Sequence, residues 1–234
     1  KEDCPLVNTP LRQLSQLFPD LNIVIVGLIR EGKPIVPKGE DQMLAGDEVY
    51  FVVDSDQIDR AMVAFGHEER EARNLLIFGG GNIGMFLAKE LEQNHDWVRA
   101  KIIEHNKERA EAIAGELEKT IVIHGSVIDQ DILEEANVSG TETVVAVTND
   151  DETNILASLL AKKYGCSRVV TLVNNASYED LVGSIGIDVT VSPRNITVSK
   201  ILQHVRRGRI HSVHTLRDDF GELIEAEALQ TSEL

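Results

Sequence analysis

Gly79-Gly80-Gly81-Asn82-Ile83-Gly84 is the stretch of sequence that decides the fold. It follows the short apolar run Asn74 to Phe78, which is typical of a buried parallel strand, and it leads into apolar residues at helical spacing from Ile83 to Glu92. Glycines between a strand and a helix form the dinucleotide-binding fingerprint. Three of them would allow, in order, a sharp turn, the approach of a diphosphate to bare backbone, and close packing of helix on strand: Gly79, Gly81 and Gly84.

A carboxylate at the end of the next predicted strand supports this interpretation. Val98 to Ile103 contains a second short strand, which ends in Glu104, about 20 residues beyond the last glycine. A carboxylate at that place accepts hydrogen bonds from ribose hydroxyls and repels a 2′-phosphate. The sequence therefore predicts NAD(H) or an adenine nucleotide such as ATP or ADP, and disfavours NADP. The alternative is a Gly-rich tight turn with Glu104 as an ordinary solvated strand end.

The centre of the chain, from Arg73 to about Pro193, alternates predicted strands and helices with short loops. This alternation predicts an α/β fold, a Rossmann-like doubly wound parallel sheet that binds ligands at the carboxyl ends of its strands. The strands expected in it are Asn74–Phe78, Val98–Ile103, Thr120–His124, Thr143–Val147, Arg168–Leu172 and Val189–Val191.

Two further loops follow strands and should therefore lie on the ligand side of the sheet. One is Gly125-Ser126, and the other begins at Thr148. In the functional interpretation, Thr148 and Asn149 hydrogen-bond the distal ribose or the nicotinamide. In the alternative, Asn149 and Glu152 form a helix cap. With the glycine loop, the candidate binding residues are Gly79, Gly81, Asn82, Ile83, Gly84, Glu104, Ser126, Thr148, Asn149 and Asp150.

Residues 1–66 predict a separate, small α+β module, and the charged residues 67–72 predict a linker behind it. A helix from Thr9 to Phe18 would be capped by Asn8 or Thr9. Asn22–Arg30 and Lys33–Val36 are expected to form two strands of a hairpin that turns at Glu31-Gly32. A further strand, Glu48–Val53, and a closing helix, Ser55–Phe65, complete the expected module.

Composition narrows the class of protein. The 234 residues are 42% apolar, enough for a sizeable core, yet no apolar stretch approaches the ~20 residues of a membrane helix and no secretory signal opens the chain. Cys4 and Cys166 show no metal-type spacing, so we predict no metal site and a reducing cytoplasm. The net charge of −16 argues against nucleic-acid binding, and residues 1–66 offer no basic recognition helix for a DNA-binding regulator.

One segment departs from the acidic balance. Val189 to Leu216 contains no Asp or Glu but holds five basic residues and three histidines: Arg194, Lys200, Arg206, Arg207, Arg209, His204, His211 and His214. Such a segment could face an acidic partner subunit or anionic lipid headgroups. Alternatively, Arg206 and Arg207 merely complement the end of a helix that starts at about Thr197.

No catalytic residue is predicted. A dehydrogenase would share the fingerprint but needs a proton-transfer group over the nicotinamide. No Tyr-x-x-x-Lys pair exists, since Tyr50, Tyr164 and Tyr178 are followed four residues later by Asp54, Arg168 and Val182. We therefore predict a nucleotide sensor rather than an enzyme, with an NAD-dependent oxidoreductase as the alternative.

Taken together, these motifs resemble the RCK (KTN) domains of cytoplasmic regulatory subunits of bacterial Trk potassium-uptake systems. The resemblance rests on the glycine loop and on four other places: Glu104, Val122-Ile123-His124-Gly125, Ala146 to Asn154, and His204-Val205-Arg206-Arg207. Two positions depart from the family pattern. Ser126 stands where many members carry Asp or Asn, and Leu172 stands where many single-copy members carry Arg.

The resemblance implies more than the residues show by themselves. Residues 1–66 look like an RCK-C module that is missing its start, 73–205 like an RCK-N nucleotide-binding domain with its crossover helix, and 206–234 like the truncated start of a second RCK-C module. Such domains form homo-oligomers, as dimers or rings, on the inner face of the bacterial cell membrane. There they regulate a TrkH-like potassium-transporter subunit when NADH, NAD⁺ or ATP occupies the cleft.

Overall fold

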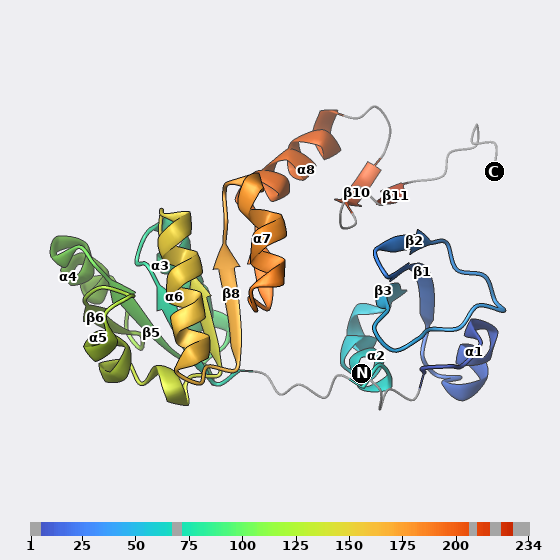
Figure 1. Cartoon of the computed structure of the whole chain (residues 1–234), viewed down its shortest axis with the longest axis horizontal. Coiled ribbons are helices and arrows are strands. Elements are labelled where there is room, and N and C mark those ends of the chain that lie inside the picture. The colour runs from blue at the N-terminus through green and yellow to red at the C-terminus, as the bar shows by residue number, and fades with distance from the viewer. Residues whose placement is uncertain (1–5, 67–71, 206–209, 216–220, 227–234) are drawn as a thin grey trace. The chain divides into compact units, whose positions relative to one another are not determined.

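Six parallel strands form the sheet that carries the glycine loop (Figure 1). The computed structural model describes residues 6–66, 72–205, 210–215 and 221–226 of a chain that divides into two units, Lys1–Arg70 and Glu71–Leu234. In the second unit the strand order is β6-β5-β4-β7-β8-β9. The bounds are β4 Asn74–Phe78, β5 Arg99–Glu104, β6 Ile121–His124, β7 Thr143–Ala146, β8 Arg168–Leu172 and β9 Val189–Val191.

The predicted Rossmann-like, doubly wound sheet is confirmed. Every neighbouring pair in it is parallel, and the strand order reverses between β4 and β7, where consecutive connections leave in opposite directions. In open α/β sheets the crevice at such a reversal is where ligands bind. The loop after β4 and the loop after β7 border this crevice, so the fold brings residues 79–84 and 148–150 to one place.

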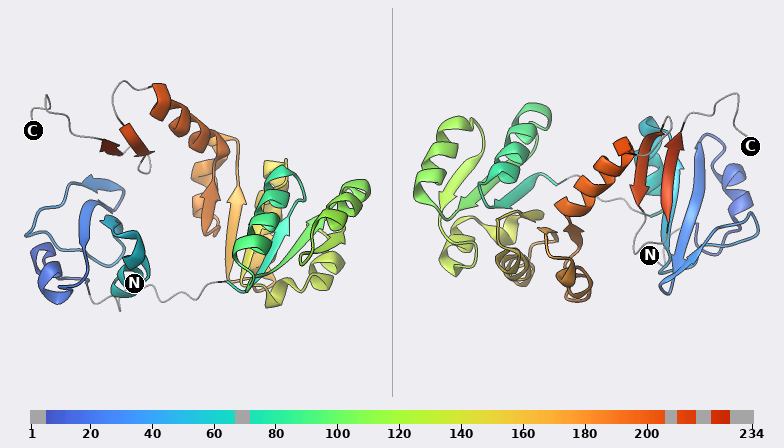
Figure 2. Two further views of the ribbon diagram at one scale, coloured as in Figure 1. Left: turned by 180° about the vertical axis from the view of Figure 1, so that it is seen from behind. Right: turned by 90° about the horizontal axis from the view of Figure 1, so that it is seen from above.

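Helices cover both faces of the sheet, and each face has its own core. On one face Phe78 and Val144 pack with residues of α5, α6 and α7, while on the other Ile77 and Ile102 pack with α3 and α4. Figure 1 shows α6 in front of the sheet, and Figure 2 shows α3 in front when the view is reversed. The bounds are α3 Asn82–Asn94, α4 Lys107–Glu116, α5 Gln130–Glu135, α6 Asp151–Lys163, α7 Glu179–Ser184 and α8 Pro193–Val205, with short 3-10 helices η3 Val138–Gly140 and η4 Ala176–Tyr178.

The first unit is a three-stranded antiparallel sheet with short helices. Its hairpin turns at Glu31-Gly32 as predicted, because both residues have positive φ, 50° and 72°, as a two-residue turn between antiparallel strands requires. Phe51 stacks on Phe65 at a ring-centroid distance of 4.7 Å. The elements are η1 Leu11–Gln13, α1 Leu14–Leu17, β1 Ile23–Arg30, β2 Lys33–Ile35, β3 Glu48–Val53, η2 Ser55–Gln57 and α2 Ile58–Ala64, with sheet order β2-β1-β3.

Two predicted helix starts are wrong. Pro10, rather than Asn8 or Thr9, precedes the first helical turn, because Val7 and Pro10 form bridges with Met43 and Gln42 and keep that segment extended. The helix expected from about Thr197 begins four residues earlier, at Pro193, because proline is tolerated in a first helical turn.

Several sequence expectations concern residues outside the described part of the chain. These are most of the linker, residues 67–71, together with Arg206, Arg207 and Arg209 of the basic segment. Beyond α8 the structure describes an antiparallel pair, β10 Ile210–Thr215 and β11 Glu222–Ala226. The assignment of 206–234 to a second module stays a prediction.

Candidate functional site

The three fingerprint glycines have different physical reasons to be glycine. Gly79 has φ +102°, and an added Cβ would lie 3.0 Å from the Cα and N of Thr148. At Gly84 an added Cβ would overlap the carbonyl oxygen of Gly79. Gly81 has an ordinary φ of −68°, and no atom lies within 4 Å of its added Cβ. The first and last glycines are thus required by the fold, whereas Gly81 faces open space.

Helix α3 begins at the glycine loop without a side-chain cap. Gly81 is its N-cap residue, and the first backbone bond of the helix runs from Met85 N to Gly81 O, 2.9 Å. By contrast, side chains cap the neighbouring helices α4, α5 and α6, namely Asn106, Asp129 and Asp150. The first N–H groups of a helix have no intrahelical acceptor and lie at its positive end. At α3 they are left for an anion such as a diphosphate.

Glu104 lies against this loop, as the fingerprint requires. Its Oε2 accepts a hydrogen bond from Gly80 N, 2.7 Å, and its Oε1 accepts one from Asn106 N, 2.8 Å. The carboxylate is half-buried, and its oxygens have further acceptor capacity for ribose hydroxyls. Arg109, which the sequence analysis did not single out, donates from Nε to Gly80 O at 2.8 Å.

Thr148 stands on the other side of the crevice, held by a buried amide. Asn154 Oδ1 accepts hydrogen bonds from Thr148 N, 2.9 Å, and Thr148 Oγ1, 2.7 Å. The Nδ2 of Asn154 donates to the carbonyl oxygens of Thr148 and Leu172, both at 3.1 Å. Asn154 is fully buried and uses its whole hydrogen-bonding capacity, so it ties the end of β7 to the end of β8.

The two acidic residues that follow Asn149 hold the backbone of this region, a role that the sequence analysis did not assign to them. Asp150, not Asn149, caps α6, since its Oδ2 accepts a hydrogen bond from Thr153 N at 2.8 Å. The side chain of Thr153 and, second, this backbone N–H lower the pKa of the Asp150 carboxyl. Buried Asp151 accepts from the backbone N–H of Asn174 and Asn175, at 2.9 and 2.8 Å. The alternative interpretation, a cap by Asn149 with Glu152, is therefore wrong, because α6 begins one residue later than that cap requires.

The remaining predicted site residues lie around the same crevice. Ser126 follows β6 directly after Gly125, whose N–H donates to Glu104 O at 2.9 Å, so Ser126 is placed beside the end of β5. Asn82 and Ile83 form the first turn of α3, and Asn149 is exposed next to Thr148. The fold thus brings the ten predicted residues to one edge of the sheet, and whether each touches a ligand stays a prediction.

An apolar hollow of about 340 Å³ begins at this edge and runs along the α3 side of the sheet. Ile83, which is 48% exposed, borders it at the glycine loop. Strands and helix α8 supply the rest of the lining: Val145, Val147, Val170, Leu172, Val191, Pro193, Ile196 and Thr197. The sequence analysis did not predict this hollow. The apolar residues of β7 to β9 and of α8 that line it were the sequence feature that could have indicated it.

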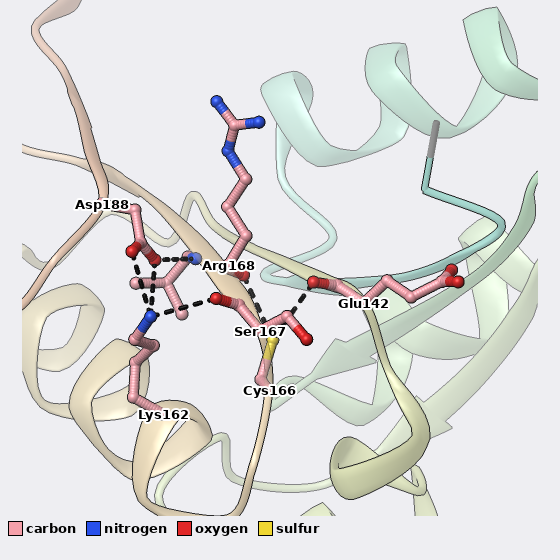
Figure 3. A network of polar contacts seen from close by, with 7 residues as sticks. Glu142, Lys162, Cys166, Ser167, Arg168 and Asp188 are labelled. Carbon is pink, nitrogen blue, oxygen red and sulfur yellow. Dashed lines mark hydrogen bonds and ion pairs between the residues drawn. The ribbon is translucent and has the colours of Figure 1, made fainter. Parts of the chain in front are cut away.

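The opposite edge of the sheet carries a structural polar network (Figure 3). Lys162 Nζ contacts both carboxylate oxygens of Asp188 at 3.0 Å, and Asp188 Oδ2 accepts from Val169 N at 2.7 Å. Cys166 is buried here, its Sγ 3.1 Å from Arg168 O, and burial raises the pKa of the thiol, which disfavours the reactive thiolate form. This network joins the amino ends of β7, β8 and β9.

Within the described residues, no three His, Cys, Asp or Glu side chains are grouped as a metal site would need. The same part of the chain contains no helix with the length and apolarity to cross a membrane.

Fold and site together define a class: a Rossmann-like α/β domain with a dinucleotide fingerprint, joined to a small α+β module. Comparison with protein families agrees with this class, since residues 75–193 match the TrkA-N domain and residues 1–66 match the TrkA-C domain. The chain belongs to the TrkA family.

Curated relatives named as potassium uptake proteins match most or all of this chain. The Trk system potassium uptake protein TrkA of Azorhizobium caulinodans is 51% identical over 233 residues, covering 100% of this chain and 51% of the relative. The TrkA of Halomonas elongata is 42% identical over 224 residues, covering 96% and 48%. The chain thus spans about half the length of the relatives it matches.

Solved structures share the fold. The crystal structure of the GsuK RCK domain superposes with a TM-score of 0.60 at 20% identity, covering 87% of this chain and 44% of that one. The GsuK channel bound to NAD has the same TM-score and identity, with coverage of 86% and 36%.

Proposed function

We propose that this chain is the nucleotide-sensing part of a regulatory subunit that controls potassium transport through a TrkH-like membrane partner. The observation that carries the proposal is the uncapped N-terminus of α3 behind the open position at Gly81, with Glu104 beside it. This geometry suits a diphosphate joined to an unphosphorylated ribose. The naming of the relatives as potassium uptake proteins supports the transport role.

NAD(H) is the ligand that we propose, with ATP or ADP at the same site. The NAD-bound state of GsuK, which shares the fold, supports a dinucleotide. In our assignment Gly79, Gly81 and Gly84 form the diphosphate turn, with Asn82 and Ile83 in the first turn of α3. Glu104 accepts from the adenosine ribose, Ser126 lies on the adenine side, and Thr148, Asn149 and Asp150 border the distal part.

The hydrogen bonds of the acidic side chains at the crevice favour a regulatory protein over an enzyme that turns the nucleotide over. Glu104, Asp150 and Asp151 each accept backbone N–H groups, so their carboxylates already act as structural acceptors. A general acid or base must instead reach the reacting atom of the substrate. We therefore assign no catalytic residue. Steady turnover of NADH with a carbonyl substrate would favour the alternative, an NAD-dependent oxidoreductase.

Self-association is the second part of the proposal. Besides Ile83 and Ile196, which line the apolar hollow, α3 and α8 carry further exposed apolar side chains: Phe86, Val198 and Ile201. Exposed apolar side chains that gather on one surface mark protein contact sites. We propose a cytoplasmic homo-oligomer, peripheral on the inner membrane face, in which residues 1–66, 73–205 and 206–234 belong to successive RCK-C, RCK-N and RCK-C modules. The net charge of −16 supports the absence of nucleic acid among its partners.

The binding proposal is tested by titrating the chain with NADH, NAD⁺, ATP and ADP. We expect NADH and ATP to compete for one site and Gly81→Asp to abolish both, because the new carboxylate occupies the open position and repels phosphate. Glu104→Ala should weaken NADH by about 10- to 100-fold, the scale of hydrogen bonds to a charged group. Unchanged affinity in Gly81→Asp would remove the diphosphate assignment.

The transport proposal needs the full-length protein in cells. Potassium uptake that depends on this protein should lose its nucleotide dependence in the Gly81→Asp variant while the protein level stays the same. Uptake that continues to respond to nucleotide in this variant would contradict the sensing role.

A further inference from the structure

Two side chains of the neighbouring βα unit hold the peptide groups of the glycine loop. Glu104 accepts from Gly80 N–H at 2.7 Å, and Arg109 donates to Gly80 O at 2.8 Å. The backbone of Arg109 is held in the first turn of α4, since its N–H donates at 2.9 Å to Asn106 Oδ1, the cap of that helix. The N–H and the carbonyl of Gly80 are therefore both held by residues of β5 and α4, which lie 24 and 29 positions later in the sequence.

Planarity of the peptide carries the effect of Arg109 to the next residue. The carbonyl of Gly80 and the N–H of Gly81 belong to one trans peptide, so they point in opposite directions. With Gly80 O held toward Arg109, the N–H of Gly81 is turned away from α4. Glycine backbones rotate freely, and three consecutive glycines would otherwise populate several orientations.

We propose that Arg109 is a positioning residue for the nucleotide site. It orients the Gly80–Gly81 peptide so that the N–H of Gly81 joins the uncapped N–H groups of α3 in binding the diphosphate. This inference rests on the proposed nucleotide site and adds a residue to it. Arg109 acts through the backbone, not by direct contact of its charge with phosphate.

The test compares Arg109→Met with a matched control. Arg109→Met keeps the apolar stem and removes both the donor and the charge, and Lys107→Met removes one charge from the same first turn of α4, at an exposed side chain. Affinities for ADP and for adenosine, which lacks phosphate, are measured by calorimetry at low and high salt. We expect Arg109→Met to weaken ADP by about 10- to 100-fold and adenosine by less than about threefold, with an unchanged salt dependence of ADP binding. Lys107→Met should bind both like the wild type.

Three results would overturn the inference. Unchanged ADP affinity would show that the loop is oriented without Arg109, and an equal loss for adenosine would show a general loss of structure. A shallower salt dependence would show direct pairing of the guanidinium with phosphate. A wild-type chain that binds no nucleotide would refute the proposed function itself, which separates the two failures. If Arg109→Met does not fold, Arg109→Gln is used, for which we expect a smaller loss confined to ADP.

Discussion

At the scale of single residues, the fingerprint separates into two glycines that the fold needs and a third, Gly81, for which only the proposed ligand gives a reason. Gly84 packs against the carbonyl of Gly79 and lies 3.2 Å, measured from an added Cβ, from Ile77 Cγ2. Gly81 has neither crowding nor a special backbone conformation. A substitution at Gly84 should therefore act on stability, and one at Gly81 on binding.

Gly84→Ala should destabilise the second unit by about 1–3 kcal/mol, because the added methyl group overlaps backbone that cannot move without opening α3. The measurement is urea unfolding followed by the emission of Trp97, the only tryptophan of the chain. Gly115→Ala is the control: it lies in α4 with open space around it, and should stabilise by up to about 1 kcal/mol. Equal stability of the two variants would contradict the packing role of Gly84.

At the scale of elements, buried polar side chains join neighbouring loops. Asn154→Asp should destabilise the second unit by about 3 kcal/mol or more at pH 7, because a carboxylate oxygen replaces the donor that faces the carbonyls of Thr148 and Leu172. Burial raises the pKa of the introduced carboxyl, so protonation at lower pH removes the buried charge and supplies one donor. The loss of stability should therefore shrink as the pH falls from 7 toward 4.

Asn149→Asp is the matched control for this prediction, because Asn149 is exposed five residues earlier. Urea unfolding of both variants at several pH values checks the prediction. A pH-independent loss in Asn154→Asp would mean that the loss comes from shape rather than from charge.

In the first unit, an ion pair joins the end of β1 to the turn before β3. Arg30 donates to both oxygens of Asp47, from Nε at 2.9 Å and from Nη2 at 2.7 Å, and the Asp47 side chain is 2% exposed. These hydrogen bonds lower the pKa of Asp47 below its ordinary value of 3.8. The stabilisation is therefore complete above the ordinary pKa and is lost as the pH falls through the lower, folded-state pKa.

Asp47→Asn should cost on the order of 2 kcal/mol at pH 7 and remove this part of the acid sensitivity of the first unit. Two-dimensional NMR of β1 to β3 during urea titrations at pH 7 and at pH 2 to 4 measures it separately from the second unit. Asp56→Asn, at an exposed carboxylate in η2, is the control. An unchanged acid response in Asp47→Asn would show that other carboxyl groups cause it.

The bounds of an element were predicted best from the sequence where a short apolar run lies between polar, glycine or proline residues. Glu48–Val53, Asn74–Phe78, Arg168–Leu172 and Val189–Val191 were predicted to the residue. Helix starts were less accurate, since a cap depends on which residue leaves the extended conformation, as Pro10 and Asp150 show. The roles of Arg109 and Asn154 could not be predicted, because each depends on a backbone carbonyl of another loop or strand, Gly80 for Arg109 and Leu172 for Asn154.

At the scale of the whole molecule, the exposed apolar surface predicts self-association. Phe86 is 72% exposed and lies one helical turn after Ile83, which borders the hollow. Phe86→Glu should weaken self-association about tenfold or more, as measured by sedimentation velocity. Ile121→Glu, at a 57% exposed position on the edge strand β6, should leave it unchanged. A monomeric wild type, or an equal effect of both substitutions, would contradict the assignment of this surface.

The different reasons for the three glycines also bear on how such domains diverge. A copy of this domain that no longer senses nucleotide would still have to fold, so selection would retain glycine at the positions of Gly79 and Gly84. The position of Gly81, which has an ordinary backbone conformation and open space around it, would be free to drift. In duplicated domains of this kind, a fingerprint that keeps its outer glycines but lacks the middle one would mark an inherited scaffold whose ligand has been lost.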